Sequence, residues 1–317
     1  MPKKNKSPRL SGASSGLASL AASLVCVVSG LIVGFLVLLI LGGVTMSQSG
    51  EEFTFAALLK TTWEQGFKPI VQGGFYSKAN MMGMAVRMEI LQAAPLIMTG
   101  LSVAFAYKTG LFNIGAAGQY TVGAFMALYF AIVLKMPWWV CLIASALGGA
   151  VWGAIPGFFK AYLNVNEVIT AIMFNWIGMY LVNLLLANMP NMLASGWGAS
   201  NSDRTAALNV ANPGAILPRG PFAALFGNSS WINISIIITI IFAILVWVIL
   251  QKTTFGYELK ACGLSRDAAQ YAGINSKRNI VLSMVISGAL SGIGGGIYYL
   301  AGTGQYVLEK SILGMGF

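Results

Sequence analysis

The sequence predicts an all-α protein that crosses a membrane about seven times. Hydrophobic residues fill 57% of its 317 positions and charged residues only 9%, with a mean hydropathy of +0.75. Soluble domains carry roughly 25% charged residues, so this composition excludes the soluble classes. The charges also cluster, which leaves apolar stretches long enough for the roughly 20 residues of a bilayer-spanning helix.

Seven spans are expected in these charge-free stretches. In chain order they are Leu20–Leu41, Leu91–Tyr107, Ile114–Leu134, Trp138–Phe159, Val168–Asn188, Trp231–Leu250 and Ile280–Ala301. The first follows a basic N-terminus, as a secretory signal would. Its apolar core, however, exceeds the roughly 7–15 residues of a signal, and no small-residue cleavage site follows. We therefore interpret it as a retained anchor.

The basic residues predict the orientation of the spans. With the N-terminus in the cytoplasm, eleven of the nineteen Lys and Arg residues fall on the cytoplasmic side, as the positive-inside rule requires. Residues 1–19 are then a basic cytoplasmic N-terminus and 20–317 a single transmembrane domain. Its outer loops are 45–89 and 190–230, and its long cytoplasmic loop is 251–279. The net charge of +10 thus follows mainly from topology, so we expect contact with membrane lipid and none with nucleic acid.

Outer loop 190–230 is rich in Asn, Gly, Ser and Pro, a composition typical of turns. Two interpretations remain open for it, an ordered solvated connection and a docking surface for a partner.

The side chains that support most enzyme chemistry are scarce. The chain has no histidine, and its three cysteines are too scattered for a metal site. Few carboxylates fall at membrane depth, so proton relays also lack their usual groups. The glycine-rich run Gly292–Gly296 is not followed by the lysine of a phosphate-binding loop. We expect a protein that is not an enzyme and binds no cofactor itself.

Glycines recur at helical spacing in two of the expected spans. They are Gly149, Gly153 and Gly157 in the fourth, and Gly288, Gly292 and Gly296 in the last. Small-residue stripes let helix backbones approach closely in lipid, so tight helix packing is the simpler interpretation. The two surrounding sequences also look faintly alike, which hints at an internal repeat of the kind found in transporters.

Polar residues within the spans are candidates for a substrate path. Asn175 and Asn183 lie two i+4 steps apart in the fifth span, and Gln119 lies in the third. Because an unpaired amide is costly in hydrocarbon, these side chains should face the bundle interior or a water-filled path. Interhelical hydrogen bonding and a role in the path both remain open.

Loop 251–279 contains the pattern of a short capped helix. Ser265 is placed to cap a helix from Arg266 to Ala272, and Gly273 is placed to end it. A short helix held between two membrane spans can transmit force to a partner.

Several separated strings identify a family. They are GLFNIGAAGQ at 110–119, NVNEVIT at 164–170, TFGYELK at 254–260 and AAQYAGIN at 268–275. In this order they resemble the permease subunits of bacterial ABC importers for sugars, branched-chain amino acids and nucleosides. The nucleoside branch, with guanosine-like substrates, fits best. The resemblance covers roughly residues 95–317.

The resemblance implies a multi-pass subunit in the bacterial plasma membrane. Its implied partners are a second permease, cytoplasmic ATPase subunits that bind ATP and magnesium, and an external substrate-binding lipoprotein. The segment 263–273 would be the coupling helix that seats in a groove of the ATPase. The residues implied in coupling are Glu258, Lys260, Gly263, Ser265, Arg266, Asp267, Ala268, Ala269 and Gly273.

The substrate would pass between the two permeases, close to polar residues that can bond ribose hydroxyls or base edges. The candidates for this path are Asn113, Gln119, Asn175, Trp176 and Asn183. Trp176 could stack on a base, although packing or contact with lipid is the simpler role for it.

Two features depart from the resemblance. Family members usually carry Glu just after the GLFNIG string, where this chain has Ala117, so any role of that carboxylate does not carry over. Such permeases also continue past a string like GMGF at 314–317 into further membrane helices, so we expect the family fold to include C-terminal helices beyond those seen here.

Other functions remain open at this point. The same subunit could carry simple sugars such as ribose or galactose, with branched-chain amino acids a more distant choice. An ion-driven secondary transporter is disfavoured because intramembrane carboxylates are scarce. A membrane scaffold would need no polar path.

Overall fold

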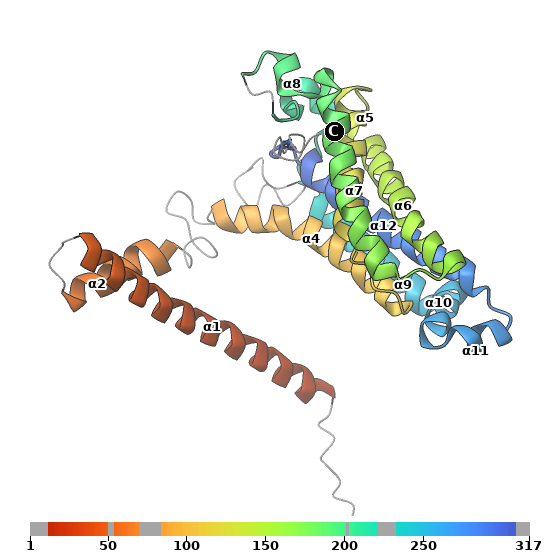
Figure 1. The fold of residues 1–317 in the computed structure, drawn as a ribbon, viewed down its shortest axis with the longest axis horizontal. Helices are drawn as coiled ribbons and strands as arrows, with labels where there is room; N and C mark the ends of the chain where they lie inside the picture. The colour runs from red at the N-terminus through yellow and green to blue at the C-terminus, as the bar shows by residue number, and fades with distance from the viewer. Residues whose placement is uncertain (1–11, 50–53, 70–83, 201–202, 221–232, 309–317) are drawn as a thin grey trace, which may run out of the picture. The chain divides into compact units, whose positions relative to one another are not determined.

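The structure, a computed structural model, describes residues 12–49, 54–69, 84–200, 203–220 and 233–308 (Figure 1). The backbone contacts divide the chain into two units, Met1–Val86 and Arg87–Phe317. In the parts that the structure describes, regular structure is helical apart from two isolated β-bridges. The expected all-α fold of a polytopic membrane protein is confirmed.

The first unit consists of a long helix and a shorter pair. Helix α1 runs over Gly12–Ser49, and α2, Phe55–Thr61, continues into the π-helix η1, Thr62–Phe67. Phe35 of α1 makes edge contacts with the rings of Trp63 and Phe67, at centroid distances of 6.3 and 5.3 Å. The section Ala21–Val44 is long and apolar enough to cross a membrane, as expected for the anchor. The helices within outer loop 45–89 were not predicted.

Six long helices make up most of the second unit. They are α4 Met84–Lys108, α5 Ala116–Ile132, α6 Trp138–Leu163, α7 Glu167–Ala187, α9 Ser235–Lys252 and α12 Ser276–Leu300. Each contains or overlaps one expected span. Their ends differ from the expected bounds. Helix α12 begins earlier because it continues through the polar residues Ser276–Asn279, whereas α5 is shorter than its expected span.

Five helices in the described ranges are long and apolar enough to span a membrane: the anchor section of α1, then α6, α7, α9 and α12. Helix α5 is apolar but shorter, with 17 residues. Helix α4 has 25 residues and carries Gln92, Thr99 and Ser102.

Helix α12 is the central helix of the second unit. Of its apolar window 72% is buried, against 22–33% for α6, α7 and α9. Three consecutive glycines explain how it accommodates three neighbours. Cβ atoms added at Gly294, Gly295 and Gly296 would meet the Pro95 carbonyl oxygen of α4, the Tyr120 carbonyl oxygen of α5 and the Ser145 side chain of α6.

The two predicted glycine stripes, one on α6 and the other on α12, face each other. A Cβ atom added at Gly149 would lie 2.8 Å from the Cα of Gly292, closer than real side chains approach. Ser145 strengthens the same contact by donating a hydrogen bond of 2.6 Å to the Gly292 carbonyl oxygen. The stripes therefore serve close backbone packing, the simpler of the two interpretations.

One end of the second unit is covered by the segments 190–200, 203–220 and 303–308. They form short helices, η2 Pro190–Met192, η3 Ala194–Trp197, α8 Leu208–Ala211 and η4 Pro213–Ala215, and the bridges Leu193↔Thr205 and Arg204↔Val307. Asn212 holds this cover to the end of α5 by donating to the Ala131 and Met136 carbonyl oxygens, both at 3.0 Å. The described part of outer loop 190–230 is thus an ordered connection, and its role in docking stays a prediction.

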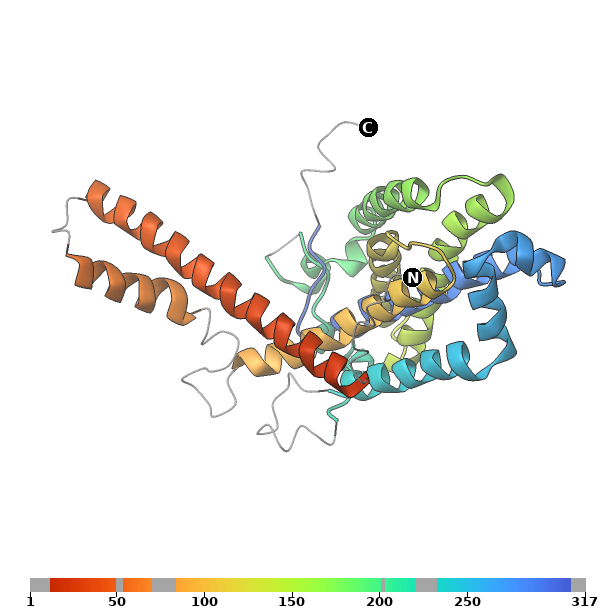
Figure 2. The ribbon, with the colours of Figure 1, turned by 90° about the horizontal axis from the view of Figure 1, so that it is seen from below.

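The opposite end carries two short helices, α10 Thr254–Leu264 and α11 Arg266–Tyr271. Figures 1 and 2 show them projecting between α9 and α12, at the far end from α8. Only α11 was expected. Helix α10 begins at an N-cap that the sequence analysis did not consider, in which Thr253 Oγ1 accepts a 3.0 Å hydrogen bond from the amide of Gly256.

Candidate functional site

Helix α11 has the predicted caps at both ends. Ser265 is extended, with φ −157°, and its Oγ accepts a hydrogen bond from the Ala268 amide at 3.3 Å. Gly273 has φ +81°, a left-handed conformation that costs little for glycine. The helix ends at Tyr271, one residue before the predicted end. This short helix therefore has defined boundaries on both sides.

Helix α11 is fixed to the second unit along one side. Ala269 is buried, and Ser276 at the start of α12 donates a 3.3 Å hydrogen bond to the Arg266 carbonyl oxygen. On the other side, Asp267 and Ala268 are exposed. Helix α11 is thus joined directly to the first residue of α12.

Helix α10 packs its backbone directly against the segment that follows α4. A Cβ atom added at Gly263 would lie 2.8 Å from the carbonyl carbon of Thr109, and one added at Gly110 would lie 2.8 Å from the Cα of Gly263. On the preceding turn, Glu258 accepts a 3.2 Å hydrogen bond from the Asn279 amide group of α12. Helix α10 is therefore held to both α4 and α12.

Two large apolar side chains flank α11 and were missed by the sequence analysis. Leu264 is 90% exposed and Tyr271 is 94% exposed. The sequence did contain a pattern that could have identified them, because two large apolar residues stand at the two ends of a short helix in a polar loop. Exposed apolar groups on a structured projection are typical of a protein contact.

A cleft of about 500 Å³ opens beside this projection. It is lined by Tyr107, Lys108, Gly110, Leu111, Phe112, Glu167, Lys260, Gly263 and Leu264. The end of α4, the start of α7 and α10 thus share one surface. Lys260, predicted to contact the ATPase, lies on its wall.

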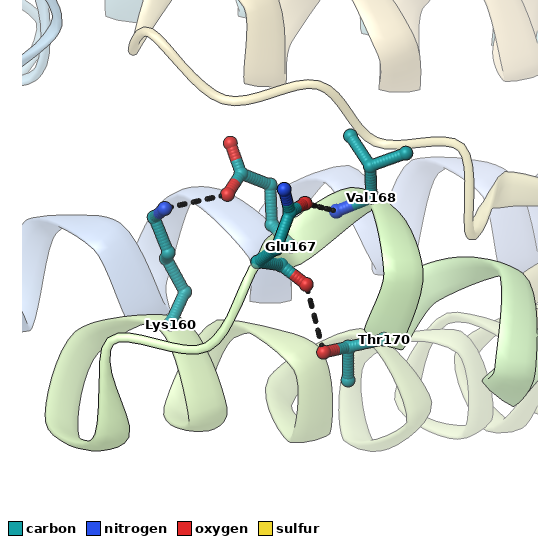
Figure 3. Close-up of polar contacts among 5 residues, drawn as sticks. Lys160, Glu167, Val168 and Thr170 are labelled. Atoms are coloured by element: carbon teal, nitrogen blue, oxygen red, sulfur yellow. Dashed lines mark hydrogen bonds and ion pairs between the residues drawn. The ribbon is translucent and has the colours of Figure 1, made fainter.

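The NVNEVIT string forms the sharp turn from α6 to α7 (Figure 3). Asn164 ends α6 in a left-handed conformation, with φ 50°, and the Asn166 side chain caps α7 by accepting from the Val168 amide at 2.9 Å. Glu167 pairs with Lys160 at 2.7 Å, with side chains only 16% and 15% exposed. This ion pair joins the last turn of α6 to the first turn of α7 and fixes their angle.

The predicted path residues Asn113 and Gln119 lie together in the interior. Asn113 is 1% exposed and so is Gln119. Their amide groups bond each other reciprocally, at 2.8 and 3.2 Å, and the Asn113 amide also donates to Ser287 Oγ of α12 at 2.7 Å. Ser287 in turn donates to the Ser102 carbonyl oxygen of α4 at 2.7 Å. Of the two open roles, hydrogen bonding between segments is therefore observed for this pair.

Of the other three path candidates, Asn175 contacts the loop that carries this pair, and Asn183 and Trp176 have contacts within α7. Asn175 is half-buried and caps the same loop from outside, donating to the Ile114 carbonyl oxygen at 2.9 Å and accepting from the Gly118 amide at 2.8 Å. Asn183 is buried and donates to the Met179 carbonyl oxygen of its own helix at 2.9 Å. Trp176 is 56% exposed, beside the Tyr180 ring.

Taken together, these contacts connect the projecting helices to the interior of the second unit. The described residues place a capped helix, a backbone contact and a hydrogen-bonded loop in one continuous chain of contacts from Tyr271 to Ser287. The Ala117 position, where relatives were expected to carry Glu, lies exposed at the start of α5 next to this loop.

Comparison with known proteins gives a consistent answer. Residues 87–317 match the family described as branched-chain amino acid transport system / permease component. The guanosine ABC transporter permease protein NupP of Bacillus subtilis is 33% identical over 306 residues, which cover 95% of this chain and 78% of NupP. The nucleoside ABC transporter permease protein NupB of Lactococcus lactis is 38% identical over 239 residues, 72% of this chain and 63% of NupB.

A more distant relative is named for a different substrate, glucose. The glucose ABC transporter permease protein TsgB13 of Haloferax volcanii is 28% identical over 232 residues, 72% of this chain and 60% of that protein. No solved structure matches the chain. The predicted resemblance to nucleoside-type permeases is confirmed, and the chain belongs to the branched-chain amino acid transport system / permease component family, as a multi-pass permease subunit of an ABC transporter that is not itself an enzyme.

Proposed function

We propose that this chain is one permease of an ATP-driven importer that moves nucleosides into a bacterial cell through the plasma membrane. An external lipoprotein delivers the substrate, and a cytoplasmic ATPase that binds ATP and magnesium supplies the energy. The observation that carries the coupling role is the exposed, doubly capped helix α11, joined through α10 to the backbone of Gly110. The names of NupP and NupB support a nucleoside as substrate.

The distribution of basic residues supports a cytoplasmic position for α11. Lys108 and Lys260 line the cleft beside it, Lys160 pairs with Glu167 on the same wall, and Lys277 lies over the Tyr162 ring at 5.5 Å. Because cytoplasmic ends carry the excess of Lys and Arg, this end faces the ATPase and the end with α8 faces outward. The N-terminus is then cytoplasmic.

The coupling mechanism follows from these contacts. Leu264 and Tyr271 insert into an apolar groove of the ATPase, with Arg266 and Asp267 available for polar contacts at its rim. When the ATPase dimer closes, it displaces α11 and α10, and the Gly263 contact moves the loop at 109–115. That loop is bonded to α12 and α4 through Ser287, so the displacement tilts both helices. ATP energy thereby becomes helix movement in alternating access.

In this mechanism, four amide side chains form part of one wall of the substrate path. Asn113 and Gln119 hold the loop in place, Asn175 caps it, and Asn183 stabilises α7. Replacing Asn175 by alanine tests its direct contribution. If uptake and substrate preference are unchanged, Asn175 does not contact the substrate.

The proposal is tested with the complete complex in proteoliposomes. The chain is reconstituted with the second permease, the ATPase and the lipoprotein, and uptake of labelled guanosine, ribose and leucine is measured with internal ATP. We expect guanosine uptake that is inhibited by vanadate. Uptake of ribose alone would favour the sugar alternative, while uptake that needs an ion gradient and ignores vanadate would favour a secondary transporter.

The coupling role is tested separately by Leu264→Ser and Tyr271→Ser. We expect nucleoside-stimulated ATP hydrolysis and uptake to fall together at least tenfold, because exposed apolar anchors dominate such contacts. Val210→Ser is the matched control, since Val210 is 61% exposed at the opposite end of the unit. Normal uptake by the Tyr271→Ser and Leu264→Ser variants would exclude this end as the ATPase contact.

A further inference from the structure

A second cavity lies within the membrane-embedded part of the second unit. It has a volume of about 350 Å³ and is lined by Gln92, Pro95, Leu96, Thr99, Tyr120 and Tyr298. These residues come from α4, α5 and α12, and none of them belongs to the predicted path. The volume falls within the roughly 300–1,000 Å³ of small-ligand sites.

The glycines of α12 bring α4 and α5 close to α12 beside this cavity. Gly294 admits the α4 backbone at the Pro95 carbonyl oxygen, and Gly295 admits the α5 backbone at the Tyr120 carbonyl oxygen. The ring of Tyr298 then projects from α12 one turn beyond Gly294, toward the same two helices. Three helices thus meet beside a space that Tyr120 and Tyr298 border.

Pro95 adds local backbone freedom at the wall. Proline has no amide hydrogen, so the α4 hydrogen-bond ladder is interrupted there. One turn later, the Thr99 hydroxyl donates to the Pro95 carbonyl oxygen at 3.1 Å or to that of Leu96 at 2.9 Å. The helix nevertheless continues through Pro95 without a break.

The wall carries polar side chains among apolar ones. Gln92 lies 16 positions before Lys108, about 24 Å along the helix, which is within a hydrocarbon core of about 30 Å. Its side chain is exposed on the described structure. An amide and two phenols at this depth indicate a water-filled or substrate-filled space.

From this arrangement we propose that the cavity holds the planar base of the substrate during its passage. The proposal rests on the nucleoside function above and places the contact on α4, α5 and α12. Tyr298 and Tyr120 offer aromatic faces and hydroxyls, which suit stacking and hydrogen bonding to any nucleobase. Gln92 can donate to and accept from a base edge through the same amide. A sugar lacks the planar ring and gains little from the two tyrosines.

The first test compares three variants in the reconstituted complex at saturating lipoprotein. Tyr298→Leu removes the ring and should lower the rate of guanosine uptake about tenfold, whereas Tyr298→Phe keeps the ring and should retain most of it. Phe158→Leu, an exposed aromatic residue of α6, is the control. Equal rates for the wild-type chain and the Tyr298→Leu variant would overturn the proposal.

The second test measures how accessible the cavity is to a thiol reagent, and it does not depend on transport activity. In membranes containing the complex, with Cys26, Cys141 and Cys262 replaced by alanine, Gln92→Cys should react with a hydrophilic thiol reagent. Guanosine should slow this reaction severalfold, and ribose should not. Leu147→Cys, 60% exposed on α6, is the lipid-facing control and should stay unlabelled.

The possible outcomes separate the two proposals. An unreactive Gln92→Cys means that lipid or another helix fills the space, and a reaction that guanosine does not slow means that no base binds there. Either result overturns the cavity proposal while leaving nucleoside import intact. If the wild-type complex takes up no nucleoside, the proposed function itself fails, whatever the labelling shows.

Discussion

Gly263 of α10 and Gly110 at the end of α4 are in direct backbone contact, with room for a hydrogen atom but not for a methyl group on either residue. The contact joins the segment that carries α11 to the loop that carries Asn113. Gly110 also has φ +72°, so it needs glycine for two reasons. This pair directly connects the proposed ATPase contact to the membrane interior.

Gly263→Ala should weaken coupling. The added methyl group would meet the backbone of Thr109 and Gly110 at 2.8 and 2.9 Å, so α10 must shift away. We expect transport to fall at least tenfold, while ATP hydrolysis continues at a rate that no longer depends on the substrate. Gly100→Ala is the control, because nothing lies within 4 Å of its added Cβ. Tight coupling in the Gly263→Ala protein would contradict the role of this contact.

The packing of α6 on α12 should be sensitive to a single methyl group. In Gly292→Ala the new Cβ would lie 2.9 Å from the Cα of Gly149. Overpacking of this kind costs about 1–3 kcal/mol, so the midpoint of thermal unfolding in detergent should fall by several degrees. Gly30→Ala, with open space around it in α1, should leave that midpoint unchanged or raise it. A Gly292→Ala protein of wild-type stability would mean that the two helices separate easily.

The Lys160–Glu167 ion pair should stabilise the turn between α6 and α7. Both side chains are mostly buried and 2.7 Å apart, so Glu167→Gln leaves the lysine without its charged partner. A hydrogen bond between charged groups contributes about 1.5–3 kcal/mol, and we expect a loss of that order in unfolding free energy. The double variant Lys160→Met/Glu167→Met should be less destabilised than the sum of its single variants. Additive effects would show that the pair contributes little.

The side-chain amides of Asn113 and Gln119 should contribute to stability as one coupled unit. Asn113→Ala removes the partner of the Gln119 amide and a donor to Ser287. Leaving such buried groups unpaired costs about 1–3 kcal/mol, and Gln119→Ala should cost a similar amount. Because the two share their hydrogen bonds, the double variant should cost clearly less than the sum, as measured by unfolding in detergent. Strict additivity would show that the two amides act independently.

Much of the fold could be predicted from periodicity and composition. Charge-free stretches located the long helices, and Ser265 with Gly273 located α11 to within one residue, because caps are encoded within a few positions of each helix end. The glycine stripes predicted close packing, though not that they face each other across α6 and α12. Helix α10 and the exposed positions of Leu264 and Tyr271 were missed, since a loop with mixed polarity gives no clear helical period.

The sequence by itself determined the class of protein, the places of its membrane helices and its family, because hydropathy, caps and short strings are local properties. Only the tertiary structure decided what the polar side chains do. Asn113 and Gln119 lie six positions apart in the chain but bond each other and Ser287, which is 174 positions from Asn113. It also decided that Gly110 and Gly263 touch and that Tyr120 and Tyr298 border one cavity. Such relations depend on how helices pack, and in a membrane packing is set by complementary shape more than by hydrophobic pattern.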